Sequence, residues 1–141
     1  MLKKKAVIDS NVILVGLTAE GTSSANFIIN LNKLKDKYEF VISDDIYQEV
    51  IRNIPYHTKE KFSRLLKFKA LIIKDFFSDS NLFQKYRNLG LKKGDIAIAA
   101  FAEKENADFL ISENRHFLNE LKTRKFKIVN AEQFLKEVIK T

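Results

Sequence analysis

Ala6-Val7-Ile8-Asp9-Ser10-Asn11 is the first place in the sequence where a short apolar run ends in polar residues. Four more short apolar runs follow, and none of the five alternates apolar with polar residues. This pattern is typical of strands that are covered on both faces. Each run is therefore predicted to be a strand of a mostly parallel sheet, and the four later runs are Phe40-Val41-Ile42, Leu71-Ile72-Ile73, Phe109-Leu110-Ile111 and Ile128-Val129.

Longer amphipathic segments separate these runs. Their alternation with the strands predicts an α/β fold of three layers, in which helices cover both faces of the sheet. The chain has no repeats and no Pro- or Gly-rich linker, and its 141 residues suit one compact domain. We therefore expect a single domain over residues 1–141. The helical candidates lie near 22–36, 44–53, 58–69, 79–89, 94–106 and 131–140.

The composition excludes several kinds of protein. Hydrophobic residues make up 45% of the chain and charged residues 30%, which indicates a packed core under a charged surface. Cysteine is absent, which excludes disulfides, thiolate zinc sites and cysteine nucleophiles. Asp9 interrupts the first apolar run too early for a signal peptide, and the longest run, 96–102, is far shorter than the roughly 20 residues that cross a bilayer. We expect a cytoplasmic protein without a membrane segment.

The charge is basic and unevenly distributed. There are 25 Lys and Arg residues against 18 Asp and Glu, a net charge of +7. Residues 52–74 hold seven basic residues and one acid, and residues 115–127 hold five basic residues and one acid. Such windows favour a polyanionic partner, although a solvated surface is the simpler interpretation of each window alone.

Acidic and polar residues follow the predicted strands. Asp9 ends the first run, Glu49 lies in the helix after the second, and Ser112-Glu113-Asn114 follows the fourth. Asp95 begins the helix before that fourth run. In open α/β sheets, ligands bind outside the carboxyl ends of the strands, so these residues are candidates for a common site.

Each acid also has a structural interpretation. Asp95 could be an N-cap of its helix, and Glu49, at the rim of an apolar arc, could be an exposed helix residue. Asp44 and Asp45 are better explained as first-turn charges after a Ser43 cap. If Asp9, Glu49 and Asp95 do converge, three negative charges share a small space and repel one another, and the charge on the buried Asp9 needs compensation. Their all-oxygen ligands suit Mg²⁺ or Mn²⁺.

These segments together resemble the PIN-domain family, and most of all its small VapC-type ribonuclease toxins. The similar segments run from 6 to about 130 and include Ala6-Val7-Ile8-Asp9-Ser10-Asn11-Val12-Ile13, Ser43 with Glu49, the helix opened by Gly94-Asp95, and 107–117. The resemblance implies a five-stranded parallel sheet. It also implies a metal-dependent ribonuclease, the toxin of a toxin-antitoxin pair, commonly dimeric and inhibited by an antitoxin.

The resemblance also implies roles for individual residues. Asp9 and Asp95 hold the metal, and Glu49 binds it through water or orients the nucleophile. Ser112 and Asn114 hydrogen-bond the metal's waters or the phosphate. Ser10, Asn11 and Glu113 are supporting neighbours. The basic windows become the RNA track, where Lys and Arg neutralise phosphates without reading sequence. Its candidate residues are Lys61, Arg64, Lys67 and Arg115.

The sequence departs from the family at Asn114, which stands where a fourth acid is usual. Three carboxylates remain, which leaves open whether one or two metal ions bind. Two other functions stay open: a non-catalytic PIN-like module that binds RNA or protein, and a haloacid-dehalogenase-type phosphatase with Asp9 as nucleophile. His116 lies where many relatives carry another acid, and a solvent-facing loop histidine is its simpler interpretation.

Overall fold

The computed structural model describes residues 2–140 and contains a five-stranded sheet in which all neighbouring strands are parallel. The strand order is β3-β2-β1-β4-β5, so β1 lies at the centre. The apolar runs of β1 and of its two neighbours β2 and β4 are buried, as their uninterrupted apolar character predicts. The strands are β1 (Lys4–Ile8), β2 (Tyr38–Ser43), β3 (Ile72–Lys74), β4 (Phe109–Ile111) and β5 (Lys127–Val129).

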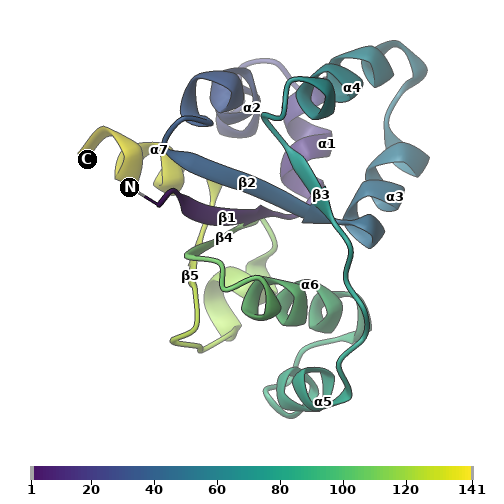
Figure 1. Ribbon diagram of the computed structural model, residues 1–141, viewed down its shortest axis with the longest axis vertical. Helices are drawn as coiled ribbons and strands as arrows, with labels where there is room; N and C mark the ends of the chain where they lie inside the picture. The colour runs from purple at the N-terminus through teal and green to yellow at the C-terminus, as the bar shows by residue number, and fades with distance from the viewer. Residues whose placement is uncertain (1, 141) are drawn as a thin grey trace.

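Helices cover both faces of the sheet (Figure 1). Helices α1 to α4 lie on one side, where α2 also packs against α7, and α5 and α6 lie on the other. This is the predicted three-layer α/β arrangement. The helices are α1 (Ser10–Thr18), α2 (Ser23–Leu34), α3 (Asp44–Asn53), α4 (Lys59–Lys67), α5 (Ser80–Asn88), α6 (Lys93–Lys104) and α7 (Ala131–Lys140), with a 3₁₀ turn η1 (Tyr56–Thr58) and a π-helical turn η2 (His116–Glu120).

Aromatic side chains fill the core on both sides of the sheet. On the α2 and α7 side, the Phe134 ring meets the rings of Phe27 and Phe109 edge to face, at centroid distances of 5.4 and 5.3 Å. On the other side, Phe76 meets Phe101 of α6 at 5.5 Å. Such pairs add to the stabilisation that comes from burying the rings. They hold α7 against the sheet and α6 against the segment that follows β3, and α6 carries Asp95.

The predicted strands and helices are present with small shifts of their ends, but helix α1 was not predicted. Its residues Val12, Ile13 and Val15 are β-branched and Gly16 has low helix propensity, so local preference disfavours a helix here. Burial decides instead, because Val12 and Ile13 have no exposed surface in the core. The apolar face of the helix predicted near 22–36 is largely core, because Phe27, Ile28 and Leu31 are buried.

No single helix within residues 2–140 is long and apolar enough to span a bilayer. Helices α1 and α2 reach the required length and composition only together, and they are bent by 96° at their junction.

Candidate functional site

The chain changes direction across the sheet between β1 and β4. From β1 it proceeds outward to β2 and β3, then returns to the other side of β1 to form β4 and β5. Asp9 and Ser112 directly follow these two neighbouring strands. The backbone N–H of Asp9 donates to the carbonyl of Ile111 at 2.9 Å, which sets the two strand ends side by side. Such a switch point is where ligands bind in open α/β sheets.

Asp9 is held at this point by hydrogen bonds to both carboxylate oxygens. Its Oδ1 accepts from the backbone N–H of Ser10 at 2.7 Å, and its Oδ2 accepts from the Ser112 hydroxyl at 2.7 Å. Asp9 is 4% exposed and Ser112 is fully buried. Asp9 is also the N-cap of α1, so the helix that local propensity disfavours begins at the site itself.

Asn114 connects this pair to Asp95. The Asn114 backbone N–H donates to the Ser112 hydroxyl oxygen at 2.9 Å, and its side-chain Nδ2 donates to Oδ1 of Asp95 at 3.1 Å. Asp95 is the third residue of α6, whose N-cap is Lys92, so Asp95 is not the helix cap that its sequence position also allowed. A continuous chain of hydrogen bonds therefore joins Asp9, Ser112, Asn114 and Asp95, and we call these four residues the acid network.

Glu49 approaches the acid network from α3. The Ser43 hydroxyl caps this helix by accepting from the N–H of Ile46 at 3.2 Å, and Asp44 and Asp45 form its acidic first turn, both as predicted. Glu49 is exposed, one turn further along.

The surroundings of Asp9 raise its pKa to about 6, mainly because the carboxyl is buried. Hydrogen bonds from Ser112 and Ser10 lower the pKa, whereas the charges of Glu49 and Asp95 raise it further. Both distant carboxylates thus lie near enough to act on Asp9 electrostatically. Of the ion pairs formed by residues 2–140, none involves Asp9, Glu49 or Asp95, so this negative charge is not balanced by Lys or Arg.

The donor set is that of a hard cation with few protein ligands. Within residues 2–140, no three His, Cys, Asp or Glu side chains stand close enough together to form a metal-binding group. Mg²⁺ commonly binds proteins through one or two carboxylates and keeps several waters. The carboxylates of Asp9, which is buried, and Asp95, which is partly exposed, are the oxygen ligands offered to such a hydrated ion, and this all-oxygen pair does not fit zinc.

The other predicted site residues lie around the acid network with different partners. Ser10 is buried and its hydroxyl is 3.5 Å from Oδ1 of Asp9. Oδ1 of Asn11 accepts from the backbone N–H of Glu113 at 3.4 Å. The Glu113 carboxylate accepts from the N–H of Ala131, the first residue of α7, so it points to that helix. His116 is exposed, as expected, and its Nδ1 lies 2.7 Å from Glu120.

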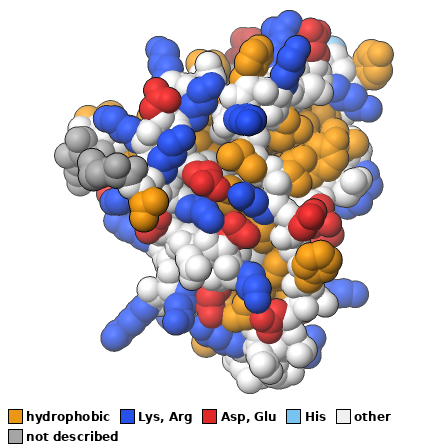
Figure 2. Space-filling view, viewed as in Figure 1, with side chains coloured by type: hydrophobic (Ala, Val, Ile, Leu, Met, Phe, Trp, Pro, Cys, Tyr) orange, Lys and Arg blue, Asp and Glu red, His pale blue; other side chains and the backbone are white. Residues whose placement is uncertain are grey.

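The predicted RNA-contacting residues are exposed on two separate elements. Lys61, Arg64 and Lys67 belong to α4, and Arg115 follows β4 directly before η2. Arg64 pairs with Glu60 at 2.8 Å. Figure 2 shows Lys and Arg side chains spread over the visible face and interspersed with acids, with an apolar patch over the region of α3, α4 and β3. The basic charge is thus distributed rather than confined to one stripe.

Comparison with known proteins bears on the fold. No family model matches the sequence. No curated protein matches it either. Among solved structures, the chain is similar to VapBC2 from Rickettsia felis, solved bound to a DNA fragment from its promoter. The TM-score is 0.66 with 19% sequence identity, over 89% of this chain and 98% of that one. The fold is PIN-like.

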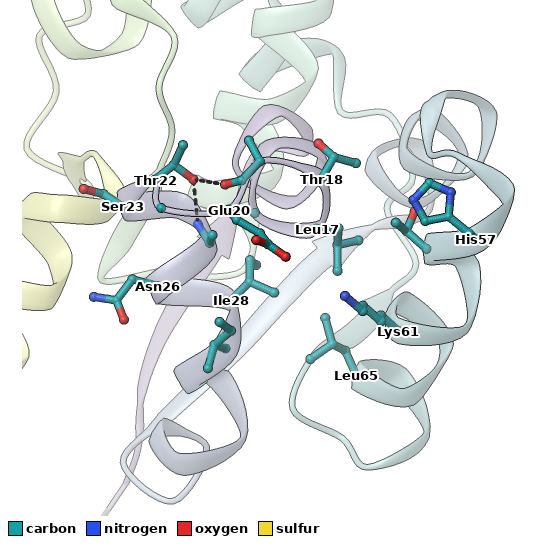
Figure 3. A pocket seen from close by; sticks show the side chains of 16 residues that line it. Leu17, Thr18, Glu20, Thr22, Ser23, Asn26, Ile28, His57, Lys61 and Leu65 are labelled. Carbon is teal, nitrogen blue, oxygen red and sulfur yellow. Dashed lines mark hydrogen bonds between the residues drawn. The ribbon is translucent and has the colours of Figure 1, made fainter.

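The PIN-like fold also carries a groove that the sequence did not indicate. It has a volume of about 1050 Å³ and lies between the α1–α2 connection and the segment η1–α4. Figure 3 shows Leu17 and Ile28 facing Leu65 across it, with Lys61 and His57 on the α4 side. Its lining comes from two segments about 40 residues apart, so neither segment alone gives a periodic signal that would have identified it.

Proposed function

We propose that this protein is a ribonuclease that depends on Mg²⁺ or Mn²⁺ and serves as the toxin of a toxin-antitoxin pair. The observation that carries the proposal is the acid network at the switch point. Glu49 lies near enough to act on Asp9, and among the described residues no Lys or Arg forms an ion pair with any of the three acids. Hydrolysis of RNA by such a site needs a cation to compensate the carboxylates.

Asp9 and Asp95 would hold the ion, and Glu49 would bind it through water or orient the attacking water. When bound, a divalent ion supplies charge stabilisation at the phosphoryl group and lowers the pKa of a bound water. Ser112 keeps the Asp9 carboxylate in place, since its hydroxyl hydrogen is already donated to Oδ2. Ser10 and Asn11 hold the start of α1 beside the site.

RNA would approach over the basic windows. Lys61, Arg64, Lys67 and Arg115 are all exposed and would neutralise phosphates without reading bases. The proposed activity is cytoplasmic, and residues 1–141 are proposed to act as one domain. The oligomer is proposed to be a homodimer, which sedimentation of the purified protein would test.

Cleavage of RNA is the decisive experiment. Purified protein with a structured RNA should cleave only with Mg²⁺ or Mn²⁺ present, lose the activity on adding chelator, and lose at least 100-fold on Asp95→Asn, because a single essential catalytic group contributes about that much or more. Asp36→Asn is the matched control. Asp36 is exposed in the turn before β2, at the amino-terminal end of the strands, whereas the acid network lies at their carboxyl end. The activity of Asp36→Asn should equal wild type.

Two other experimental results would contradict the nuclease proposal and indicate a different function. RNA binding by wild-type protein without cleavage at any metal concentration would indicate the non-catalytic module instead. Hydrolysis of a small phosphomonoester through a covalent intermediate on Asp9 would indicate the phosphatase.

The proposed partner is an antitoxin protein, which we place in the groove between α1–α2 and η1–α4. The groove lining combines polar residues with the apolar side chains of Leu17, Ile28 and Leu65. Ile29, which also lines it, is 75% exposed although it is a large aliphatic residue. Ile29→Glu should weaken inhibition by this partner and leave cleavage by the free protein unchanged. Ile139 on α7 is also largely exposed, at 84%, and Ile139→Glu should leave both unchanged.

A further inference from the structure

Both the oxygen and the nitrogen of the Asn114 carboxamide form hydrogen bonds, and the type of each partner fixes which way the group is turned. Its Oδ1 accepts from the backbone N–H of His116 at 2.9 Å, and its Nδ2 donates to Oδ1 of Asp95 at 3.1 Å. A backbone N–H can only donate, so the carboxamide oxygen must face His116. The NH₂ group therefore faces Asp95.

The backbone of Asn114 is fixed as well. Its N–H donates to the Ser112 hydroxyl, which in turn donates to Asp9. Three hydrogen bonds from one residue hold the amide between the carboxylate of α6 and the end of β4. Asn114 is thus a positioned donor in the site.

A carboxylate in this position would behave differently. An aspartate has the same shape, so one of its oxygens would accept from His116 and the other would lie about 3 Å from Oδ1 of Asp95. Two carboxylates this close cannot both stay ionised without a proton or a cation between them. The Asn114 amide supplies a donor at that place without adding charge.

We propose that the Asn114 amide takes the place of a second cation beside Asp95, so that the site binds one divalent ion per chain. Oδ1 of Asp95 is occupied by Asn114, whereas no hydrogen bond within residues 2–140 involves its Oδ2, which leaves that oxygen for the single ion shared with Asp9. This inference rests on the proposed metal-dependent function and specifies its stoichiometry.

The test is a titration of chelator-treated protein with Mn²⁺, with free Mn²⁺ measured by electron paramagnetic resonance. Wild type should bind one Mn²⁺ per chain and Asn114→Asp should bind two. Asn32→Asp makes the same charge change on the exposed face of α2 and should stay at one. Without metal, Asn114→Asp should melt roughly 5 °C below wild type, because the new charge faces Asp95 unpaired. Mn²⁺ should reverse that loss.

A second variant covers the case in which Asn114→Asp does not fold. Asn114→Ala removes the donor without adding charge, so it should still bind one Mn²⁺, more weakly than wild type.

The outcomes separate this inference from the function on which it rests. Two Mn²⁺ per wild-type chain, or two in Asn114→Ala, would overturn the inference and leave the nuclease proposal standing. A single ion in Asn114→Asp, with an unchanged metal-free melting temperature, would overturn it too. Failure of wild type to bind Mn²⁺ would overturn both proposals.

Discussion

The Ser112 hydroxyl donates a 2.7 Å hydrogen bond to Oδ2 of Asp9, across 103 residues of sequence. Both side chains are buried, and the same hydroxyl oxygen accepts from the N–H of Asn114. Ser112 therefore has no hydrogen left for a phosphate or a water. Its part in the site is to position the two residues on either side of it.

Replacing this serine tests that role. Ser112→Ala leaves a buried carboxylate oxygen and the Asn114 N–H without their partner, which should lower the free energy of unfolding by about 1–3 kcal/mol. Urea denaturation would measure the loss. Ser63→Ala, on the exposed face of α4, should change the free energy by less than about 0.5 kcal/mol. Equal stability of the two variants would contradict the role given to Ser112.

Burial of Asp9 predicts a pH dependence of stability in protein freed of divalent cations. Its pKa is raised from the ordinary 3.8 to about 6, so between these values the native state binds more protons than the unfolded state. The free energy of unfolding should therefore fall as pH rises through this window, by about 3 kcal/mol for this group. Asp9→Asn removes the contribution.

Denaturation of wild type and Asp9→Asn from pH 4 to 7 separates the effect of Asp9 from that of the other titrating groups. The free energy of unfolding of Asp9→Asn relative to wild type should rise by about 3 kcal/mol toward pH 7. A difference that stays constant across the range would show that Asp9 is not desolvated as described.

Gly16 lets α1 and α2 approach closely. A Cβ at this position would lie 2.3 Å from Cγ1 of Ile28 and 2.8 Å from the carbonyl oxygen of Ser24. Gly16→Ala should therefore destabilise the fold by about 1–2 kcal/mol, since overpacking outweighs the gain in helix propensity. In the control Gly94→Ala, the Cβ meets nothing within 4 Å, so stability should stay equal or rise. Thermal or urea unfolding of both variants decides between the two effects.

The basic residues of α4 should account for part of the salt dependence of RNA binding. Replacing all three of Lys61, Arg64 and Lys67 by Ala should weaken RNA binding. It should also reduce the slope of the logarithm of the binding constant against the logarithm of salt concentration by about 2, because each phosphate contact to a single strand contributes about 0.7. Fluorescence anisotropy over a range of salt concentrations measures this slope. The control replaces three exposed lysines near the amino-terminal end of the strands by Ala: Lys3, Lys33 and Lys37. If both triple variants show the same salt slope, the basic residues of α4 are ordinary solvated surface and do not contact RNA.

The sequence predicted the sheet well because its strands are buried on both faces, so their apolar runs stand out against the amphipathic helices. It failed at α1, where β-branched residues and Gly16 favour other conformations and only tertiary burial produces a helix. It also indicated the acids of the site, because strand ends in an α/β fold are few and their polar residues are conspicuous.

The sequence could not show how those residues bond to one another. The donation from Asn114 to Asp95 depends on where α6 begins, and Lys92, not Asp95, is its cap. The attachment of Glu113 to α7 depends on the position of a helix that starts 18 residues later. Such contacts between distant segments leave no local pattern.

The placement of β1 between β2 and β4 also sets the order in which the site can be completed. A chain emerging from the ribosome exposes Asp9 almost at once, but Ser112 and Asn114 come after four-fifths of the polypeptide, and β4 must dock beside β1 before they reach Asp9. Every shorter nascent chain lacks the partner of its buried carboxylate. The acid network therefore cannot assemble in an unfinished chain, and its four residues come together only once nearly the whole polypeptide has been made.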